Sequence, residues 1–327
     1  IFIDPILNFL RVPEEVWGGM REYLLIIFAG LLATSLYNFF SCLLRALGNS
    51  TVPLVFLAVS AILNIAWDLL FVAVFHWGIA GAAYATIFAQ YVSGIGILLY
   101  VLFRCRSLLP ERKDLRFDGE ILKEIAGLSS LTCLQQSVMN FGILMVQGLV
   151  NSFGATTMAA FAAAVKIDTF AYLPVQDFGN AYSTFVAQNY GAGNKERIRR
   201  GTKESFAIST AFSLVISALV FAFAAPLMQI FVSSAETAVI ASGVRYLRIE
   251  GAFYFGIGCL FLLYGYYRAI KRAEMSVVLT VISLGIRVLL AYVLSATFLG
   301  ETGIWMAIPI GWILADLTGL LYMRKTW

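Results

Sequence analysis

The sequence predicts an all-α protein that crosses a membrane many times. Two observations decide this class. Hydrophobic residues make up 60% of the chain and charged residues only 13%, and apolar runs of bilayer length recur along its whole length. An ordinary soluble domain is nearer half apolar and a quarter charged. The sequence also lacks the alternating polarity of outer-membrane barrel strands, so we expect the spans to be helices.

Nine apolar segments are long enough to cross a bilayer, and residues 1–10 resemble the end of a further span. The predicted spans are 19–44, 52–75, 78–103, 121–151, 155–188, 203–232, 239–267, 274–298 and 303–323. Several exceed the roughly 20 residues that a bilayer requires, so we expect them to tilt or protrude. Pro174 is expected to bend its span.

Basic residues occur in alternate connections between the spans. The connections at 76–78, 151–156 and 299–303 are nearly free of Lys and Arg, whereas the connections between them are rich in both. By the positive-inside rule the basic connections and the C-terminus are cytoplasmic. The net charge of +4 therefore reflects topology rather than nucleic-acid binding. We expect a multi-pass protein of the cell (plasma) membrane whose main surroundings are the lipid bilayer.

An internal repeat relates the two halves of the chain. A constant offset of 223 residues superimposes three early spans on the last three, and the matched pairs are Tyr23 with Tyr246, Arg45 with Arg268, Ser60 with Ser283 and Asn64 with Arg287. Two inserted residues then set Gly78 on Gly303. Both copies share one orientation, so this is a parallel repeat about an axis along the membrane normal.

The repeat predicts two pseudo-symmetric six-helix bundles. We expect residues 1–106 to form the remainder of an N-lobe, residues 107–120 a cytoplasmic linker and residues 121–327 a C-lobe. By symmetry, two spans and most of a third, or roughly 100 residues, are expected before Ile1 in a protein of twelve spans.

One span carries an acid at membrane depth. Asn64 and Asp68 lie within the apolar run 52–75, where an ionisable side chain costs about 3 kcal/mol. The two residues are one helical turn apart, about 40° around the axis, so they present an amide and a carboxylate to one point. This pair could capture a proton or coordinate Na⁺. Alternatively, these side chains join neighbouring spans through hydrogen bonds worth about 1 kcal/mol each.

Several segments resemble the multidrug and toxic compound extrusion (MATE) family. The segments LRALGNSTVP at 44–53, NIAWD at 64–68 and GIAGAAYAT at 78–86 are similar to its fourth to sixth spans, and residues 134–154 and 183–201 to its seventh and eighth. The resemblance implies a two-lobed antiporter, driven by entering H⁺ or Na⁺, that exports amphipathic, often cationic drugs.

The resemblance also implies a place for ion coupling. In one branch of the family coupling is assigned to an aspartate on the first span, an asparagine and an aspartate on the fifth and a threonine on the sixth. Asn64, Asp68 and Thr86 match the last three. Other members have carboxylates on the seventh and tenth spans, but this sequence has Gln135 and Gln136 in the seventh and no acid between Glu250 and Glu274. We therefore expect coupling in the N-lobe.

Polar residues in the second half suggest a substrate cavity. Gln136, Asn140 and Gln147 recur at helical intervals along the seventh span, and we expect them to face a cavity rather than lipid, with or without contact to substrate.

The eighth span contains Lys166, Asp168 and Asp177. Either they line the cavity, where Asp177 could attract a cationic drug, or they form an internal ion pair or hydrogen bonds that hold the spans together. Arg287 either snorkels or pairs structurally, or it binds substrate.

Two rival functions are a lipid-linked oligosaccharide flippase of the same superfamily and a non-transporting membrane scaffold. A flippase would need a strongly basic cavity, yet few basic residues, Lys166 and Arg287 among them, lie within the predicted spans. A scaffold would need a soluble output domain, which this sequence does not show. Phosphate-binding loops, catalytic pairs and nucleophile elbows are also absent from the sequence, so we expect no enzyme and no cofactor. We expect a monomer.

Overall fold

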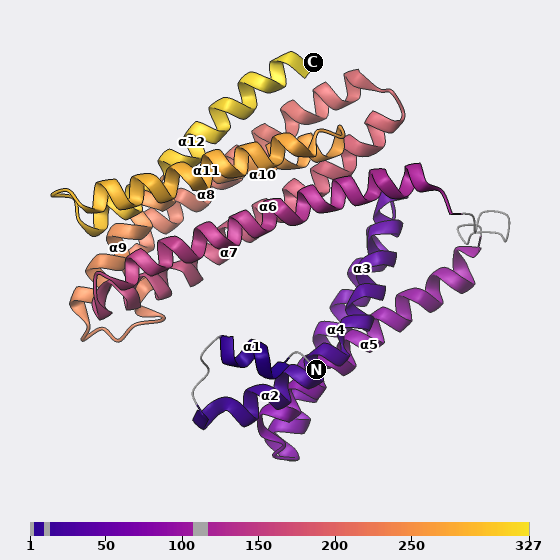
Figure 1. The fold of residues 1–327 in the computed structure, drawn as a ribbon, viewed down its shortest axis with the longest axis horizontal. Coiled ribbons are helices and arrows are strands. Elements are labelled where there is room, and N and C mark those ends of the chain that lie inside the picture. Colours follow the sequence, from indigo (N-terminus) through magenta and orange to yellow (C-terminus); the bar gives the residue numbers. More distant parts are fainter. Residues whose placement is uncertain (1–2, 10–13, 107–116, 327) are drawn as a thin grey trace. The chain divides into compact units, whose positions relative to one another are not determined.

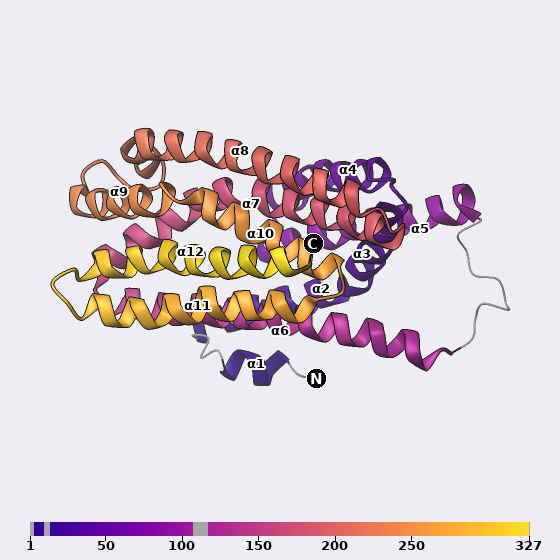
Figure 2. The same ribbon diagram turned by 90° about the horizontal axis from the view of Figure 1, so that it is seen from above.

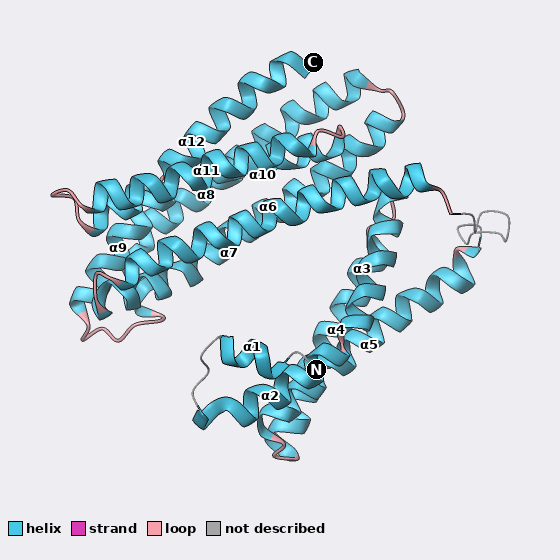
Figure 3. Cartoon of the chain, viewed as in Figure 1, coloured by secondary structure: helices cyan, strands magenta, loops and turns pink. Residues whose placement is uncertain are grey.

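The computed structural model describes residues 3–9, 14–106 and 117–326, and every regular element within these ranges is helical (Figure 3). The elements are α1 (Ile3–Phe9), α2 (Glu14–Ala29), α3 (Leu31–Ala46), α4 (Thr51–Asp68), η1 (Leu69–Val74), α5 (Gly78–Arg104), α6 (Gly119–Asn151), α7 (Ala155–Gly191), α8 (Lys195–Gln229), α9 (Thr237–Gly251), α10 (Tyr254–Ala269), α11 (Ala273–Ser295) and α12 (Glu301–Thr326). Residues 107–116 of the expected linker lie outside the described ranges.

The predicted all-α, polytopic class is confirmed. Eight helices are long and apolar enough to cross a membrane, and the bent pair α9 and α10 makes a ninth span if it is counted as one. The predicted span boundaries agree with the helix ends to within a few residues, except that α8 begins at Lys195. This earlier start has a local cause, because the Asn194 side chain caps the helix by accepting a hydrogen bond from the Arg197 amide at 3.1 Å.

One predicted span is bent. The span 239–267 is interrupted between Gly251 and Tyr254, with an angle of 51° between α9 and α10. Its repeat copy, the span 19–44, runs through α2 and α3, which meet at Gly30, the repeat mate of Phe253. Residues 17–46 nevertheless form one span, and Gly30 keeps right-handed helical backbone angles.

The chain divides into two compact units, Ile1–Phe117 and Asp118–Trp327. The first holds the N-lobe helices, in which α5 packs against α2, α3, α4 and η1 (Figure 1). The approach of α3 to α5 depends on Gly94, because a Cβ atom there would lie 2.5 Å from the backbone oxygen of Ala33. The hydroxyl of Ser60 donates to the backbone oxygen of Ala89 at 2.8 Å and fixes the register of α4 on α5.

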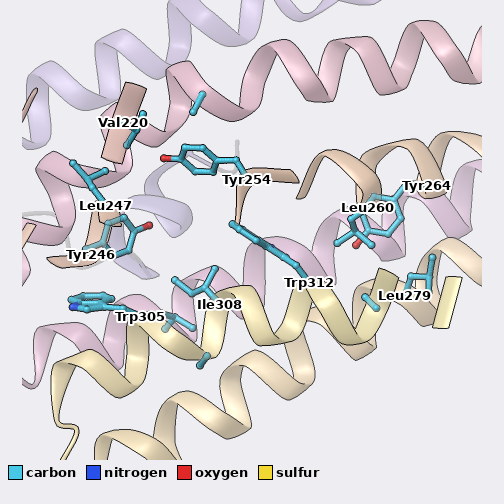
Figure 4. Packing of buried hydrophobic residues seen from close by; sticks show 14 of the residues in the cluster. Val220, Tyr246, Leu247, Tyr254, Leu260, Tyr264, Leu279, Trp305, Ile308 and Trp312 are labelled. Carbon is cyan, nitrogen blue, oxygen red and sulfur yellow. The ribbon is translucent and has the colours of Figure 1, made fainter. Parts of the chain in front are cut away.

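The second unit is a helical bundle with one continuous apolar core. Helix α10 packs against α7, α8, α11 and α12 (Figures 1 and 2). Figure 4 shows Leu260, Ile308 and Trp312 in this core, together with Tyr246 and Trp305. The ring of Trp305 stacks on Phe161 at 5.5 Å and meets Tyr246 edge-on at 4.9 Å.

Gly94→Ala should destabilise the N-lobe, because the new Cβ would collide with a backbone oxygen that cannot rotate away. Overpacking of this kind costs about 1–3 kcal/mol. The matched control is Gly18→Ala in α2, where nothing lies within 4 Å of an added Cβ and better helix propensity should stabilise slightly. Thermal unfolding in detergent would compare the two. Equal melting temperatures would contradict this account of the helix contact.

Candidate functional site

The face of α4 that carries Asn64 and Asp68 is turned toward α5. Ser60, Asn64 and Asp68 are spaced four residues apart and so lie along one side of the helix. Because Ser60 bonds the backbone of Ala89, that side packs on α5. Asn64 and Asp68 are both half-buried. The pair that the sequence singled out therefore lies beside a neighbouring helix of the N-lobe.

Asn64 and Asp68 both have unusual surroundings. The side-chain nitrogen of Asn64 is buried and has no hydrogen-bond partner among the described residues. Asp68 is the last residue of α4, and the π-helical segment η1 follows directly. Its wider turn is marked by the hydrogen bond from the Phe75 amide to the Leu70 oxygen at 2.9 Å. π-Helical segments are rare overall, and those that occur are often found at functional sites.

Thr86 lies on α5 at the level of Asn64. Ser60 of α4 contacts Ala89 of α5, and the two helices are antiparallel. Four residues further along α4 is Asn64, and four residues back along α5 is the turn that holds Thr86. The Thr86 hydroxyl donates to the backbone oxygen of Ala82 at 2.9 Å. Its oxygen keeps lone pairs that can still accept a proton or bind a cation.

The repeat supports this placement independently. The mate of Asn64 is Arg287, and the two inserted residues make Gly311 the mate of Thr86. In the C-lobe these mates are in contact, since a Cβ on Gly311 would lie 3.2 Å from the Cβ of Arg287. If the equivalent helices pack in the same way, Asn64 and Thr86 lie near each other in the N-lobe, and this stays a prediction.

The candidate cavity residues of the C-lobe divide into separate groups. Gln136 borders a small polar cavity, Asn140 is exposed on the same helix, and Gln147 donates to Asn151 at 2.8 Å. Lys166 and Asp177 are both exposed on α7. The Lys166 ammonium lies 5.8 Å from the centre of the Phe231 ring.

Lys166 and Asp168 do not form an ion pair, whereas Asp168 does make structural hydrogen bonds. Asp168 is buried, with 4% of its surface exposed, whereas Lys166 is exposed. Residues two apart on a helix point to different sides. This helical geometry alone could have separated them.

The structure reveals a buried charged cluster that the sequence analysis missed. Tyr246 donates its hydroxyl hydrogen to Asp168 Oδ2 at 2.6 Å, and Tyr254 donates to Asp168 Oδ1. Figure 4 shows the hydroxyl ends of Tyr246 and Tyr254 turned toward the space between the two rings. One carboxylate thus joins α7, α9 and α10 inside the C-lobe.

Glu250 and Arg287 complete this cluster. Glu250 is buried, with 6% of its surface exposed, and it lies beside the same Tyr246 hydroxyl. The guanidinium of Arg287 interacts electrostatically with both Asp168 and Glu250. Glu250 lies within the predicted tenth span 239–267, so the C-lobe contains buried carboxylates of its own. A signal was available in the sequence. Asp168, Glu250 and Arg287 all lie within spans, where ionisable side chains are costly unless they pair with one another.

Comparison with known proteins identifies the family to which the chain belongs. The profile of the MatE family matches residues 1–70 and 131–293. The chain belongs to the MATE family. It is 33% identical over 322 residues to the probable multidrug resistance protein YpnP of Bacillus subtilis, covering 98% of this chain and 71% of that protein. It is 27% identical to a probable multidrug resistance protein NorM of Thermotoga maritima, covering 98% of this chain and 70% of that protein.

Solved MATE structures have the same fold. The bent form of the Vibrio cholerae MATE transporter VcmN matches with a TM-score of 0.90 at 24% identity, covering 99% of this chain and 73% of that one. An outward-facing multidrug resistance MATE transporter gives a TM-score of 0.93 at 24% identity over the same shares of the two chains. The resemblance to a family of transporters that the sequence indicated is confirmed, and the family is not one of enzymes.

Asp168→Ala should strongly destabilise the C-lobe, because Arg287 would lose one of its two carboxylates and both tyrosine hydroxyls their acceptor. Leaving a buried donor without its acceptor costs about 1–3 kcal/mol. The control is Asp177→Ala on the same helix, which is exposed and should shift stability by no more than about 0.5 kcal/mol. Adding Arg287→Met should recover part of the loss in a double-mutant cycle of melting temperatures. Strict additivity would mean that the two side chains do not interact.

Proposed function

We propose that this MATE protein is a secondary-active multidrug antiporter that exports amphipathic, often cationic compounds in exchange for H⁺ or Na⁺ by alternating access. The family and the names of the relatives support the transport of drugs. The observation that carries the coupling mechanism is the half-buried Asp68 at the junction of α4 with η1, one turn from an amide nitrogen that has no partner.

The proposed coupling step uses Asp68 and the side chains on its face. A proton neutralises the carboxylate directly. Na⁺ would instead be held by the oxygens of Asp68, Asn64 and Thr86, since carboxylate, amide and hydroxyl oxygens suit a hard cation. Either event removes a negative charge from membrane depth and so changes which packing of α4 on α5 is favoured. Neutralisation of Asp68 then shifts the N-lobe between its two states and drives substrate release.

The C-lobe cluster is the second candidate for coupling. It contains two buried carboxylates, Asp168 and Glu250, and one cation, Arg287, so full ionisation leaves one negative charge. A proton or a monovalent cation would neutralise that charge. We favour the N-lobe because Asp168 in the C-lobe already accepts hydrogen bonds from two tyrosine hydroxyls.

Asp68→Asn should lower gradient-driven dye efflux at least tenfold in proteoliposomes of the full-length protein, because an amide cannot exchange a proton or neutralise Na⁺. Glu250→Gln, which keeps the side-chain shape, should retain ion dependence. The control is Glu204→Gln in the exposed pair with Arg200. Efflux would be followed with imposed Na⁺ and pH gradients separately. Full coupled transport by the Asp68 variant, with loss in the Glu250 variant, would move the coupling site to the C-lobe.

A further inference from the structure

A small polar cavity lies beside the last turn of α10 in the C-lobe. Its volume is about 80 Å³. The polar side chains that line it come from α6, α7 and α10, and they are Gln135, Gln136, Gln176, Asn180, Tyr264 and Arg268. By contrast, the larger hollow between α7 and α8, of about 540 Å³, is lined by apolar residues. The small cavity is therefore suited to a charged or strongly polar group.

Arg268 gives this cavity an unused positive charge. Its Nε donates to the backbone oxygen of Tyr264 at 3.2 Å and one terminal nitrogen donates to Asn180 Oδ1 at 3.3 Å. A guanidinium has five N–H donors, so three remain. In the described part of the chain no carboxylate lies within ion-pair distance of Arg268. The nearby acid Glu124 is paired with Lys271 instead, at 2.5 Å.

The surrounding amides complement this charge. Gln135 is buried, with 4% of its surface exposed, and it borders the cavity together with Gln136 and Gln176. Each amide can turn two N–H donors toward a bound acceptor. A planar carboxylate takes paired hydrogen bonds from arginine and further bonds from amides. The cavity is far smaller than the roughly 300–1,000 Å³ of a pocket for a whole drug, so it would hold the acidic group alone.

We propose that this cavity is a subsite for the acidic group of an anionic or zwitterionic amphipathic substrate, with Arg268 as its main partner and Gln136 as a second donor. This inference rests on the proposed transport function and narrows the substrate class. It predicts that the protein distinguishes a carboxylic acid from its own ester, although the rest of the molecule is the same.

The test uses rhodamine B and its ethyl ester, two fluorescent dyes that share a cationic ring system and differ in one carboxylate. Equilibrium binding would be measured on the purified full-length protein in detergent, and efflux in proteoliposomes. Gln136→Glu should weaken binding of the acid at least tenfold by repulsion and leave binding of the ester unchanged. Arg268→Lys should weaken acid binding less, because it keeps the charge and loses the paired geometry.

The matched control is Gln229→Glu, the same substitution at the exposed last residue of α8. It should leave both dyes unaffected. Equal losses for acid and ester in the Gln136 variant, or wild-type protein that binds neither dye, would overturn the subsite. Displacement of the dye by phosphatidylglycerol would overturn its assignment to a transported substrate. Binding of the acid without its transport would instead contradict the proposed antiport alone.

Discussion

The C-lobe depends on one buried carboxylate. Asp168 accepts hydrogen bonds from Tyr246 and Tyr254, which lie on either side of the bend between α9 and α10. An unpaired charge inside a membrane protein would be expensive, so α7, α9 and α10 are stable together only in the arrangement that brings these partners to the acid. The apolar core fills space on either side of this cluster, but apolar contacts alone would tolerate other helix registers. The polar cluster selects one of them.

Much of the architecture follows from the sequence because hydrophobicity and length are local properties. The nine spans and the internal repeat can be predicted from the sequence alone. The bend of 51° between α9 and α10 cannot be predicted in this way, because the hydrophobicity of the run 239–267 says nothing about helix direction. Its repeat copy at residues 17–46 forms one span without such a bend.

The candidate sites show the same limit. Asn64 and Asp68 could be predicted as a pair because they are four residues apart on one helix. Their spacing in the sequence is enough to show that the amide lies beside the carboxylate. The partners of Asp168 are 78 and 86 residues away along the chain, so only the packing of the helices reveals them. The same is true of the cavity around Arg268, whose lining comes from three helices. Residue types alone cannot show which amides converge on it.

The repeat mates Asn64 and Arg287 give the two halves different electrostatic behaviour. The C-lobe carries a counter-ion on a covalent tether, so the charge beside its carboxylates is always present and cannot be diluted or exchanged. At the equivalent place the N-lobe has a neutral amide, and within the described residues no cationic side chain lies within ion-pair distance of Asp68. If Asp68 is the coupling acid proposed above, its charge is balanced by a proton or an ion from solution. The C-lobe cluster would then be insensitive to the ions around the protein, and the N-lobe would respond to them.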